Sequence, residues 1–379
     1  GDDLLREASR RLRSEVRESD TVARLGGDEF TVIVRDFRRI EPVELLAEAI
    51  LGSLSLPYLL GEHEVHASAS IGITVFPNDG SEREVLLRNA DNAMYRAKER
   101  GRNDYQFYTS EMNTEAQRRR VLENALYKAL EHDELFIQYQ PIVWLDSGEL
   151  RGVEALLRWR HPELGLISPE EFIPLAEDTG LIRGIGAWVL QEACTQAARW
   201  REELNPEFKI SVNLSSRQMK RSDMAKLVAE ILERSNLPAD ALILEITESL
   251  LMSDDPDISV DLLAIQGLGV ALAVDDFGTG YSSLSYLKHL PVEILKIDRS
   301  FVSELPDDSE DAALVQAILS IADSLGLKVV AEGVETLQQA EFLREHGCEL
   351  AQGYLFSRPV DADELHIQCS KAVSHSLIA

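Results

Sequence analysis

The sequence predicts an α/β protein whose larger part is a (β/α)₈ barrel, preceded by a smaller α/β domain. Two observations carry this prediction. The chain has 379 residues, more than one ordinary core supports, so we expect two domains. From residue 135 onward, short apolar runs alternate with helical stretches. Eight such runs within about 240 residues are typical of a barrel of strands joined by helical crossovers.

Composition limits the functional class. The apolar content of 45% and the charged content of 27% are those of a soluble globular protein. A net charge of −28 argues against a surface that binds a nucleic-acid polymer or anionic lipid, but it leaves room for a small anionic ligand held by local cations. Cys194, Cys348 and Cys369 lack metal-ligand spacing, so we interpret them as buried thiols in a reducing, cytoplasmic compartment.

The first 108 residues follow an irregular α/β pattern. Helical spacing covers residues 4–12, 42–53 and 82–100, and strands are expected near 30–34, 63–75 and 105–108. Gly26 and Gly27 precede two acids and an apolar run, which indicates a hairpin turn entering a strand. The same turn could also admit phosphate and hold a metal, and both interpretations stay open. A charged helix over residues 111–132 connects to the second part.

The second part supplies the eight strands of the predicted barrel. We place them at residues 136–142, 152–157, 210–214, 242–246, 270–274, 294–297, 329–331 and 350–353. Helices are expected between most of them, at residues 185–203, 225–234, 311–325 and 337–345. In such barrels the functional site lies at the carboxyl ends of the strands.

Polar side chains gather where these strands end. The fifth strand is the plainest case, because its apolar run stops at Asp275 and Asp276 and a glycine-containing loop follows. The other strands contribute Glu154, Asn213, Glu245, Glu248, Lys296, Glu332, Glu335 and Gln352. Each residue alone would also fit an exposed loop, but together they predict a ring of oxygen ligands around one barrel mouth.

Metal ions would explain this concentration of acid. Five carboxylates cannot all ionise in one cleft without cations, and these are Glu154, Glu245, Asp275, Asp276 and Glu332. Two divalent ions would nearly balance them. Oxygen ligands without a nearby His or Cys favour Mg²⁺ or Mn²⁺ over Zn²⁺. Two such metals commonly support in-line displacement at a phosphodiester.

The motifs resemble those of the EAL cyclic di-GMP phosphodiesterases. Glu154-Ala155-Leu156 resembles the family signature, and the match runs from about residue 115 to residue 368. Further motifs follow in the family's order, at residues 140–142, 213–215, 245–248, 275–280, 296–298, 332–335 and 352–354. The resemblance implies a TIM-like EAL barrel.

The resemblance also implies roles for single residues. Two Mg²⁺ or Mn²⁺ ions per site would be held by Glu154, Asn213, Glu245, Asp275, Asp276 and Glu332. Lys296 would hold the attacking water or the phosphate, and Glu332 is also a candidate general base. Glu248 would anchor the loop over residues 276–283, which positions the metals and helps form a homodimer. The substrate would be contacted by Gln140, Arg158, Asp298, Glu335 and Gln352.

The first part resembles a GGDEF diguanylate cyclase domain. The motif residues are Gly26, Gly27, Asp28, Glu29 and Phe30, supported by residues 93–103. The family's first strand and helix would lie before Gly1, so we expect an incomplete domain that is inactive or regulatory. Arg17 and Asp20 resemble its inhibitory product site, and with Lys98 and Arg102 they could hold the dinucleotide; the spacing of Arg17 and Asp20 alone is also common at surfaces.

The resemblance implies a phosphodiesterase that hydrolyses cyclic di-GMP to linear pGpG. Three alternatives stay open: a receptor that binds cyclic di-GMP without cleaving it, a protein that is bifunctional in a full-length parent, and a barrel enzyme for sugar phosphates. The expected partners are cyclic di-GMP at the barrel, GTP or cyclic di-GMP at the GGDEF part, and a second barrel. We expect domains at 1–108, 133–370 with a connector over 109–132, and a tail over 371–379. We expect a cytoplasmic location, and whether a longer parent is anchored at the inner membrane by a segment outside this chain stays open.

Overall fold

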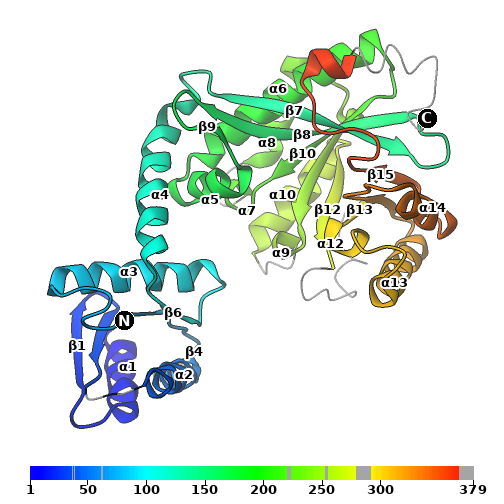
Figure 1. The fold of residues 1–379 in the computed structure, drawn as a ribbon. Coiled ribbons are helices and arrows are strands. Elements are labelled where there is room, and N and C mark those ends of the chain that lie inside the picture. The colour runs from blue at the N-terminus through cyan, green and yellow to red at the C-terminus, as the bar shows by residue number, and fades with distance from the viewer. Residues whose placement is uncertain are drawn as a thin grey trace. The chain divides into compact units, whose positions relative to one another are not determined.

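The computed structural model describes residues 1–35, 37, 39–60, 63–219, 223–251, 255–278 and 292–366. The chain divides into two compact units, Gly1–Val121 and Leu122–Ala379, which are described separately below (Figure 1). The domain bounds given above stay a prediction, because this division falls inside the predicted connector. Among the described residues, no helix combines the length and apolar content that a membrane span requires.

The first unit consists of helices and short strands. Its helices are α1 (Asp2–Glu15), α2 (Glu41–Ser55), α3 (Arg83–Glu99) and the first part of α4 (Ser110–Ala129). Its strands are β1 (Thr21–Gly26), β2 (Glu29–Ile33), β3 (Tyr58–Leu60), β4 (His63–Val65), β5 (Ile71–Ile73) and β6 (Tyr105–Phe107). The predicted hairpin at Gly26 and Gly27 is confirmed, because β1 and β2 pair antiparallel across it. The sequence interpretation missed β3.

The core of this unit is small. Leu12, Ile50 and Leu54 are its buried centre, and half-buried residues such as Phe30 and Ile71 pack around them. The strands form three separate two-stranded sheets, so each has at least one edge that no other described strand pairs. Little apolar surface therefore stabilises this unit compared with the second one.

The second unit is a closed barrel of eight strands, as predicted. The strands are β7 (Leu135–Trp144), β8 (Leu150–His161), β10 (Lys209–Leu214), β11 (Leu242–Thr247), β12 (Ala271–Phe277), β13 (Ile294–Ile297), β14 (Lys328–Ala331) and β15 (Leu350–Gln352). They pair in this order, and the pairing of β15 with β7 and of β8 with β10 closes the ring. The short β9 (Gly165–Ile167) adds to β8 outside the ring.

One strand runs against the others. β7 pairs antiparallel with both β8 and β15, whereas the strands from β8 through β10 to β15 pair parallel. Only residues 145–149 join β7 to β8, and a link this short permits a hairpin but no helical crossover. The register still places Gln140 opposite Glu154, so β7 contributes to the same end of the barrel.

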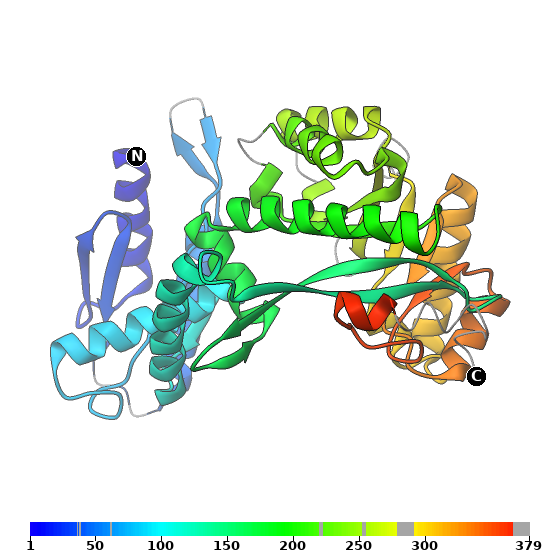
Figure 2. The ribbon, with the colours of Figure 1, turned by 90° about the horizontal axis from the view of Figure 1, so that it is seen from above.

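Helices and short helical turns surround the strands (Figure 1). They are α5 (Pro169–Thr179), α6 (Ile182–Glu203), α7 (Ser216–Met219), α8 (Met224–Ser235), η1 (Ala239–Ala241), α9 (Glu248–Leu251), α10 (Pro256–Gly267), α12 (Arg299–Val302), α13 (Ser309–Leu325) and α14 (Leu337–Glu345). The predicted helices at 185–203, 225–234, 311–325 and 337–345 are confirmed within three residues at either end. The view from above shows α6 running alongside the long β7–β8 pair (Figure 2).

Large aromatic side chains pack α5 and α6 against this pair of strands. Trp200 of α6 lies edge-on to Tyr139 of β7, with ring centroids 4.8 Å apart, and Trp159 packs against Phe172. The segment after β15 then returns to β7, because Tyr139 and Val360 exchange two backbone hydrogen bonds. Residues 353–360 thereby lead the chain from β15 back to β7.

Candidate active site

The barrel interior explains why polar groups meet at its mouth. A separate apolar cluster fills the ring and contains Ala273, Ile294, Val330 and Leu350, with Ile243 packed against it. Side chains on one face of a strand recur every second residue. The next inward layer is therefore Glu245, Asp275, Lys296, Glu332 and Gln352. The apolar layer supports this polar layer from below.

Lys296 is the centre of that layer. Its side chain is 2% exposed, and Nζ lies 2.6 Å from Glu245 Oε2 and 2.5 Å from Glu332 Oε1. The same nitrogen is 3.1 Å from Asp275 Oδ1 and 3.5 Å from Glu154 Oε2. One buried cation thus lies within ion-pair distance of four carboxylates from four different strands.

The pKa values reflect this imbalance of charge. Burial opposes the charged form of Lys296, but the surrounding carboxylates hold its pKa well above the usual value. Burial and the charge of Glu154 raise the pKa of Glu245 well above its ordinary range. Burial raises the pKa of Glu332 to about 7, in spite of its contact with Lys296. A single lysine is therefore too little positive charge for this cluster.

Glu154 is stabilised by amides as well as by Lys296. Asn213 Nδ2 donates to Glu154 Oε1 at 2.6 Å, and Gln352 Nε2 donates to Oε2 at 2.7 Å. Gln352 Nε2 also lies 2.9 Å from Gln140 Oε1. Burial raises the pKa of Glu154, but Lys296 and these two amides outweigh burial and lower it. The structure thus joins β7, β8, β10 and β15 around one carboxylate.

Asp275 and Asp276 reach the mouth through an irregularity in β12. Neighbouring residues of a regular strand point to opposite faces, so only one of the two should face the site. The register between β12 and β13 shifts between Val274 and Phe277, and Asp276 has a left-handed φ of +54°. A bulge of this kind re-aims side chains, and left-handed backbone at a residue other than glycine is characteristic of functional sites. Oxygen atoms of Asp275, Asp276 and Glu332 consequently lie within 4.8 Å of one another.

The donor set fits divalent cations. If ionised, the five carboxylates Glu154, Glu245, Asp275, Asp276 and Glu332 exceed the single charge of Lys296 by four. Burial and the neighbouring charge of Asp275 raise the pKa of Asp276, which is a further sign of unbalanced negative charge. The donors around the cluster are oxygens, which suit hard ions such as Mg²⁺.

Arg158 lies at the edge of this cluster on β8. Its guanidinium is half-buried, and its Nε donates to Gln138 Oε1 at 3.1 Å. Gln138 precedes Gln140 by two residues, so both glutamines share one face of β7. The sequence did not indicate Gln138, because an uncharged residue within a predicted strand gives no functional signal. Its spacing of two residues from Gln140, which puts both on one face of the strand, could have revealed it.

Glu248 is positioned to support the loop after β12. It is buried, and its Oε2 accepts a hydrogen bond from the backbone N–H of Gly278 at 3.3 Å. The rest of the predicted loop, from Thr279 to Ser283, lies outside the described residues. The contact agrees with the predicted anchoring at the start of the loop.

Asp298 and Glu335 are less closely engaged. Asp298 caps α12, accepting from the backbone N–H of Ser300 at 3.0 Å, and its charge contributes to the raised pKa of Asp276. Glu335 is exposed, and its backbone N–H donates to Gln339 Oε1 at 2.8 Å. Neither makes a described side-chain contact with the carboxylate cluster, so their substrate contacts stay predictions.

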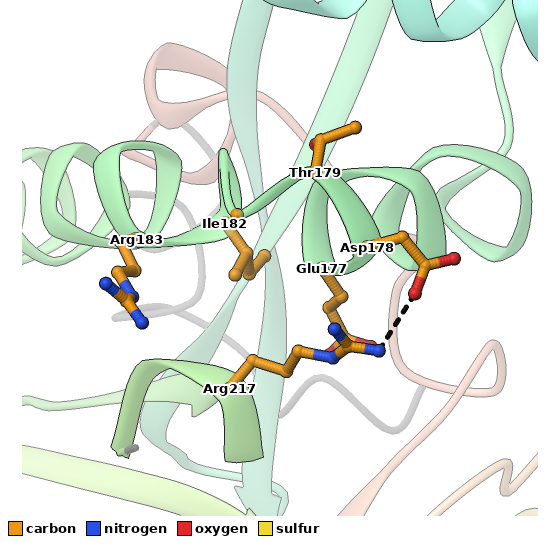
Figure 3. A pocket seen from close by; sticks show the side chains of 7 residues that line it. Glu177, Asp178, Thr179, Ile182, Arg183 and Arg217 are labelled. Carbon is orange, nitrogen blue, oxygen red and sulfur yellow. Dashed lines mark hydrogen bonds and ion pairs between the residues drawn. The ribbon is translucent and has the colours of Figure 1, made fainter. Parts of the chain in front are cut away.

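A pocket of about 420 Å³ lies beside the mouth, where α5 meets α6 (Figure 3). Arg217 of α7 spans it and pairs with Asp178 at 2.8 Å. Ser215, two residues beyond Asn213, donates its hydroxyl to Glu177 Oε1 at 2.6 Å. These contacts give Glu177, Asp178 and Arg217 hydrogen-bond or ion-pair partners. The sequence analysis did not predict this pocket.

The motif residues of the first unit have a different environment. Asp28 and Glu29 are exposed at the β1–β2 turn. Arg24 fixes the turn, because its Nε donates to the Gly27 carbonyl at 2.9 Å, and Gly27 itself has a φ of +52°. No metal-ligating group of three acids, histidines or cysteines occurs around Asp28 among the residues that the structure describes.

The structure also describes the four residues of the predicted inhibitory site. Asp20 accepts hydrogen bonds from the backbone N–H groups of Arg17 and Arg35, both at 3.1 Å. Asp20 therefore orders the turn between α1 and β1, a structural role in the absence of ligand. The side chains of Arg17, Lys98 and Arg102 are exposed. Their predicted contact with a dinucleotide stays a prediction.

The family model of the EAL domain matches residues 123–359, and that of the diguanylate cyclase GGDEF domain matches residues 1–104. The structure is a closed barrel whose acidic mouth is centred on a lysine. Because the EAL model matches more than half of the chain, the chain belongs to the EAL family. It carries a GGDEF domain ahead of the EAL domain.

Two curated relatives and one solved structure are informative. The bifunctional diguanylate cyclase/cyclic di-GMP phosphodiesterase MucR of Pseudomonas aeruginosa is 49% identical over 365 residues, which cover 96% of this chain and 53% of MucR. The cyclic di-GMP phosphodiesterase PdeR of Escherichia coli is 39% identical, covering 96% of this chain and 54% of PdeR. The chain thus spans about half the length of the curated relatives it matches. A solved structure of the PaMucR phosphodiesterase in complex with c-di-GMP has a TM-score of 0.63 and 49% identity, covering 65% of this chain and 99% of that one.

Proposed function

We propose that this chain is a cyclic di-GMP phosphodiesterase that opens the ring to linear pGpG, with its GGDEF part inactive or regulatory. The observation that carries the proposal is the cluster of five carboxylates around one buried lysine at the barrel mouth. It is supported by the names of MucR and PdeR, which share the tandem arrangement at 49% and 39% identity.

The metal assignment follows from charge and donor type. Glu154, Asn213, Glu245, Asp275, Asp276 and Glu332 would hold two Mg²⁺ or Mn²⁺ ions, whose four positive charges equal the excess charge of the carboxylates. When bound, such ions supply Lewis-acid charge for hydrolysis of a phosphodiester. For Asn213, binding requires that its amide oxygen turns toward the metal, because its nitrogen now donates to Glu154.

The chain's own residues then divide the remaining work. Lys296 would orient the attacking water or a phosphate oxygen, since its ammonium has three donors and is fixed by burial. Glu332 would accept the proton from water as the new P–O bond forms. The bond to the ribose 3′ oxygen breaks, and this oxygen would leave as a hydroxyl that takes its proton from solvent water. Gln140, Arg158 and Gln352, with Asp298 and Glu335 further out, would contact the dinucleotide.

Assembly and location are further parts of the proposal. We expect a homodimer through the barrel, formed near the loop that begins at Asp276, and the contact of Glu248 with Gly278 supports a fixed start to that loop. A cytoplasmic location agrees with Cys194 and Cys348, which are buried free thiols. Sedimentation of the active protein tests the dimer: full activity from a monomer at all concentrations would contradict it.

The function is tested by incubating the chain with cyclic di-GMP and Mg²⁺ and separating the products by chromatography. The expected product is linear pGpG. Tight binding without cleavage would instead support a cyclic di-GMP receptor. Cleavage of sugar phosphates with cyclic di-GMP untouched would support the unrelated barrel enzyme.

A further inference from the structure

Gln339 is a buried polar residue that the proposed mechanism does not use. It lies in the first turn of α14 and is only 4% exposed. Its Oε1 accepts from the backbone N–H groups of Glu335 at 2.8 Å and Thr336 at 2.9 Å. Its Nε2 donates to the Ser303 carbonyl at 3.0 Å. A buried amide whose donor and acceptor are both satisfied holds its partners in fixed positions.

The partners of Gln339 belong to two segments that carry proposed active-site residues. Thr336 ends the loop that starts at Glu332, directly after β14. Ser303 directly follows α12, a short helix that begins shortly after Lys296 on β13. The amide of Gln339 therefore joins the segment after β13 to the segment after β14.

The start of the loop after β14 is held by its own backbone. Glu332 and Val334 donate their N–H groups to the strands on either side, to the carbonyls of Ile297 at 3.0 Å and Gln352 at 3.1 Å. Gly333 lies between them with a φ of +67°, and a Cβ there would lie 2.4 Å from a side chain of α12. The loop therefore lies tightly against α12, and Gln339 fixes its last two residues.

A second buried glutamine repeats this arrangement after another barrel strand. Gln218 is 3% exposed, and its Oε1 accepts from the backbone N–H of Ser215 at 3.0 Å. Ser215 follows the proposed metal ligand Asn213 by two residues. In both places a buried amide reaches back to a loop that begins near a proposed metal ligand, which favours a role connected with the site.

We propose that Gln339 is a positioning residue that holds Glu332 in place for metal binding and proton transfer. This inference rests on the proposed function and adds a residue that touches neither metal nor substrate. Oxygen atoms of Asp275, Asp276 and Glu332 lie within 4.8 Å of one another, so a small shift of the loop changes how they share an ion. Residues that orient metal ligands from outside typically change metal affinity or activity by roughly 10- to 100-fold.

The test compares Gln339→Met with Gln339→Glu. Methionine has a similar volume but neither accepts nor donates as the amide does, whereas glutamate keeps an acceptor for the two loop N–H groups and is the other usual residue at this position of a capping box. Binding of Mn²⁺ without substrate is measured by electron paramagnetic resonance of the free ion. Hydrolysis of cyclic di-GMP is measured at saturating Mn²⁺.

We expect Gln339→Met to raise the Kd for Mn²⁺ and to lower kcat, each roughly tenfold or more, with little change in KM. Gln339→Glu should lie closer to the wild type in both quantities. If Gln339→Met does not fold, Gln339→Asn, whose amide is one methylene shorter, is compared in its place with the same expectation.

Asp308→Ala is the matched control for loss of a helix cap. Asp308 accepts from the backbone N–H groups of Glu310 at 2.7 Å and Asp311 at 3.2 Å at the start of α13. The segment before α13 carries no proposed site residue. The control should lower Tm, because a cap is lost, and leave the Mn²⁺ Kd and kcat unchanged.

The outcomes separate this proposal from the proposed function. If Gln339→Met lowers Tm as Asp308→Ala does but keeps the wild-type Mn²⁺ Kd and kcat, Gln339 only supports a helix end and the positioning proposal is wrong. It is also wrong if Gln339→Glu is as impaired as Gln339→Met, since the acceptor would then not be what holds the loop. If the wild type binds Mn²⁺ but leaves cyclic di-GMP intact, the proposed function fails, and the Mn²⁺ comparison alone decides the positioning role.

Discussion

Both units carry acidic motif residues, but the environments of these residues are opposite. In the barrel, carboxylates from several strands converge on the buried Lys296. In the first unit, Asp28 and Glu29 stand exposed on one hairpin turn, and no third metal-ligating residue joins them among the described residues. Acidic residues are therefore not a site by themselves; convergence and burial are what make divalent metal binding favourable.

The largest expected effect is at Glu154. Glu154→Ala removes a carboxylate that two amides and Lys296 hold at the centre of the mouth, so we expect turnover of cyclic di-GMP to be abolished. The variant should stay folded, because the side chain belongs to the barrel mouth and the packed layers lie below it. Activity is measured by product chromatography and folding by circular dichroism. A folded variant with near-normal turnover would refute the assignment.

Exchange of the metal ion should also affect hydrolysis at the barrel mouth. We expect hydrolysis with Mg²⁺ or Mn²⁺, none in excess chelator, and inhibition by Ca²⁺. Ca²⁺ takes more ligands at longer distances, which would displace the ions and the water from their working positions. Initial rates across a metal series provide the measurement. Equal rates with Ca²⁺ and Mg²⁺, or undiminished activity in chelator, would rule out the two-metal reading.

Lys296→Ala should have a smaller effect than Glu154→Ala. The carboxylates that would bind metal stay in place, so we expect the rate to fall roughly 10²-fold or more through lost orientation of the water. Lys209→Ala is the matched control, because Lys209 pairs with Asp240 at 2.9 Å at the opposite end of the barrel strands. That variant should keep its activity. If both lysine variants lose activity to the same extent, the loss reflects stability and not a role in the reaction.

The sequence predicts the barrel well because its signals are local and repeated. Every barrel strand was found, and Lys296, Glu245, Asp275 and Glu332 stand at or near the ends of buried apolar runs. The antiparallel course of β7 was not predicted, although the five-residue link over 145–149 is too short for a crossover and could have revealed it. When each strand is predicted from its own apolar run, the length of the segment that joins it to the next strand is not used.

Contacts between distant segments explain what was missed at the site. Gln138 accepts a hydrogen bond from Arg158 across the β7–β8 pair, and no local sequence pattern indicates this contact. The bulge that turns both Asp275 and Asp276 toward Glu332 is likewise set by the pairing of β12 with β13. The sequence names the acids, and tertiary structure determines which of them can share a metal.

The smallest expected effect concerns the first unit, where we predict that this chain makes no cyclic di-GMP from GTP. Transfer of this kind needs metals held on the triphosphate by carboxylates from more than one strand. Asp28 and Glu29 share one exposed turn, and no third metal-ligating residue joins them in the part of the chain that the structure describes. Two acids on one turn supply little of the electrostatic stabilisation that such catalysis requires. Asp28→Ala should therefore leave both the absence of synthesis and the hydrolysis by the barrel unchanged. The measurement is incubation with GTP and Mg²⁺ in the Glu154→Ala background, which prevents loss of product. Accumulation of cyclic di-GMP there, abolished by Asp28→Ala, would show that exposed acids on one turn suffice and would overturn the contrast between the two units.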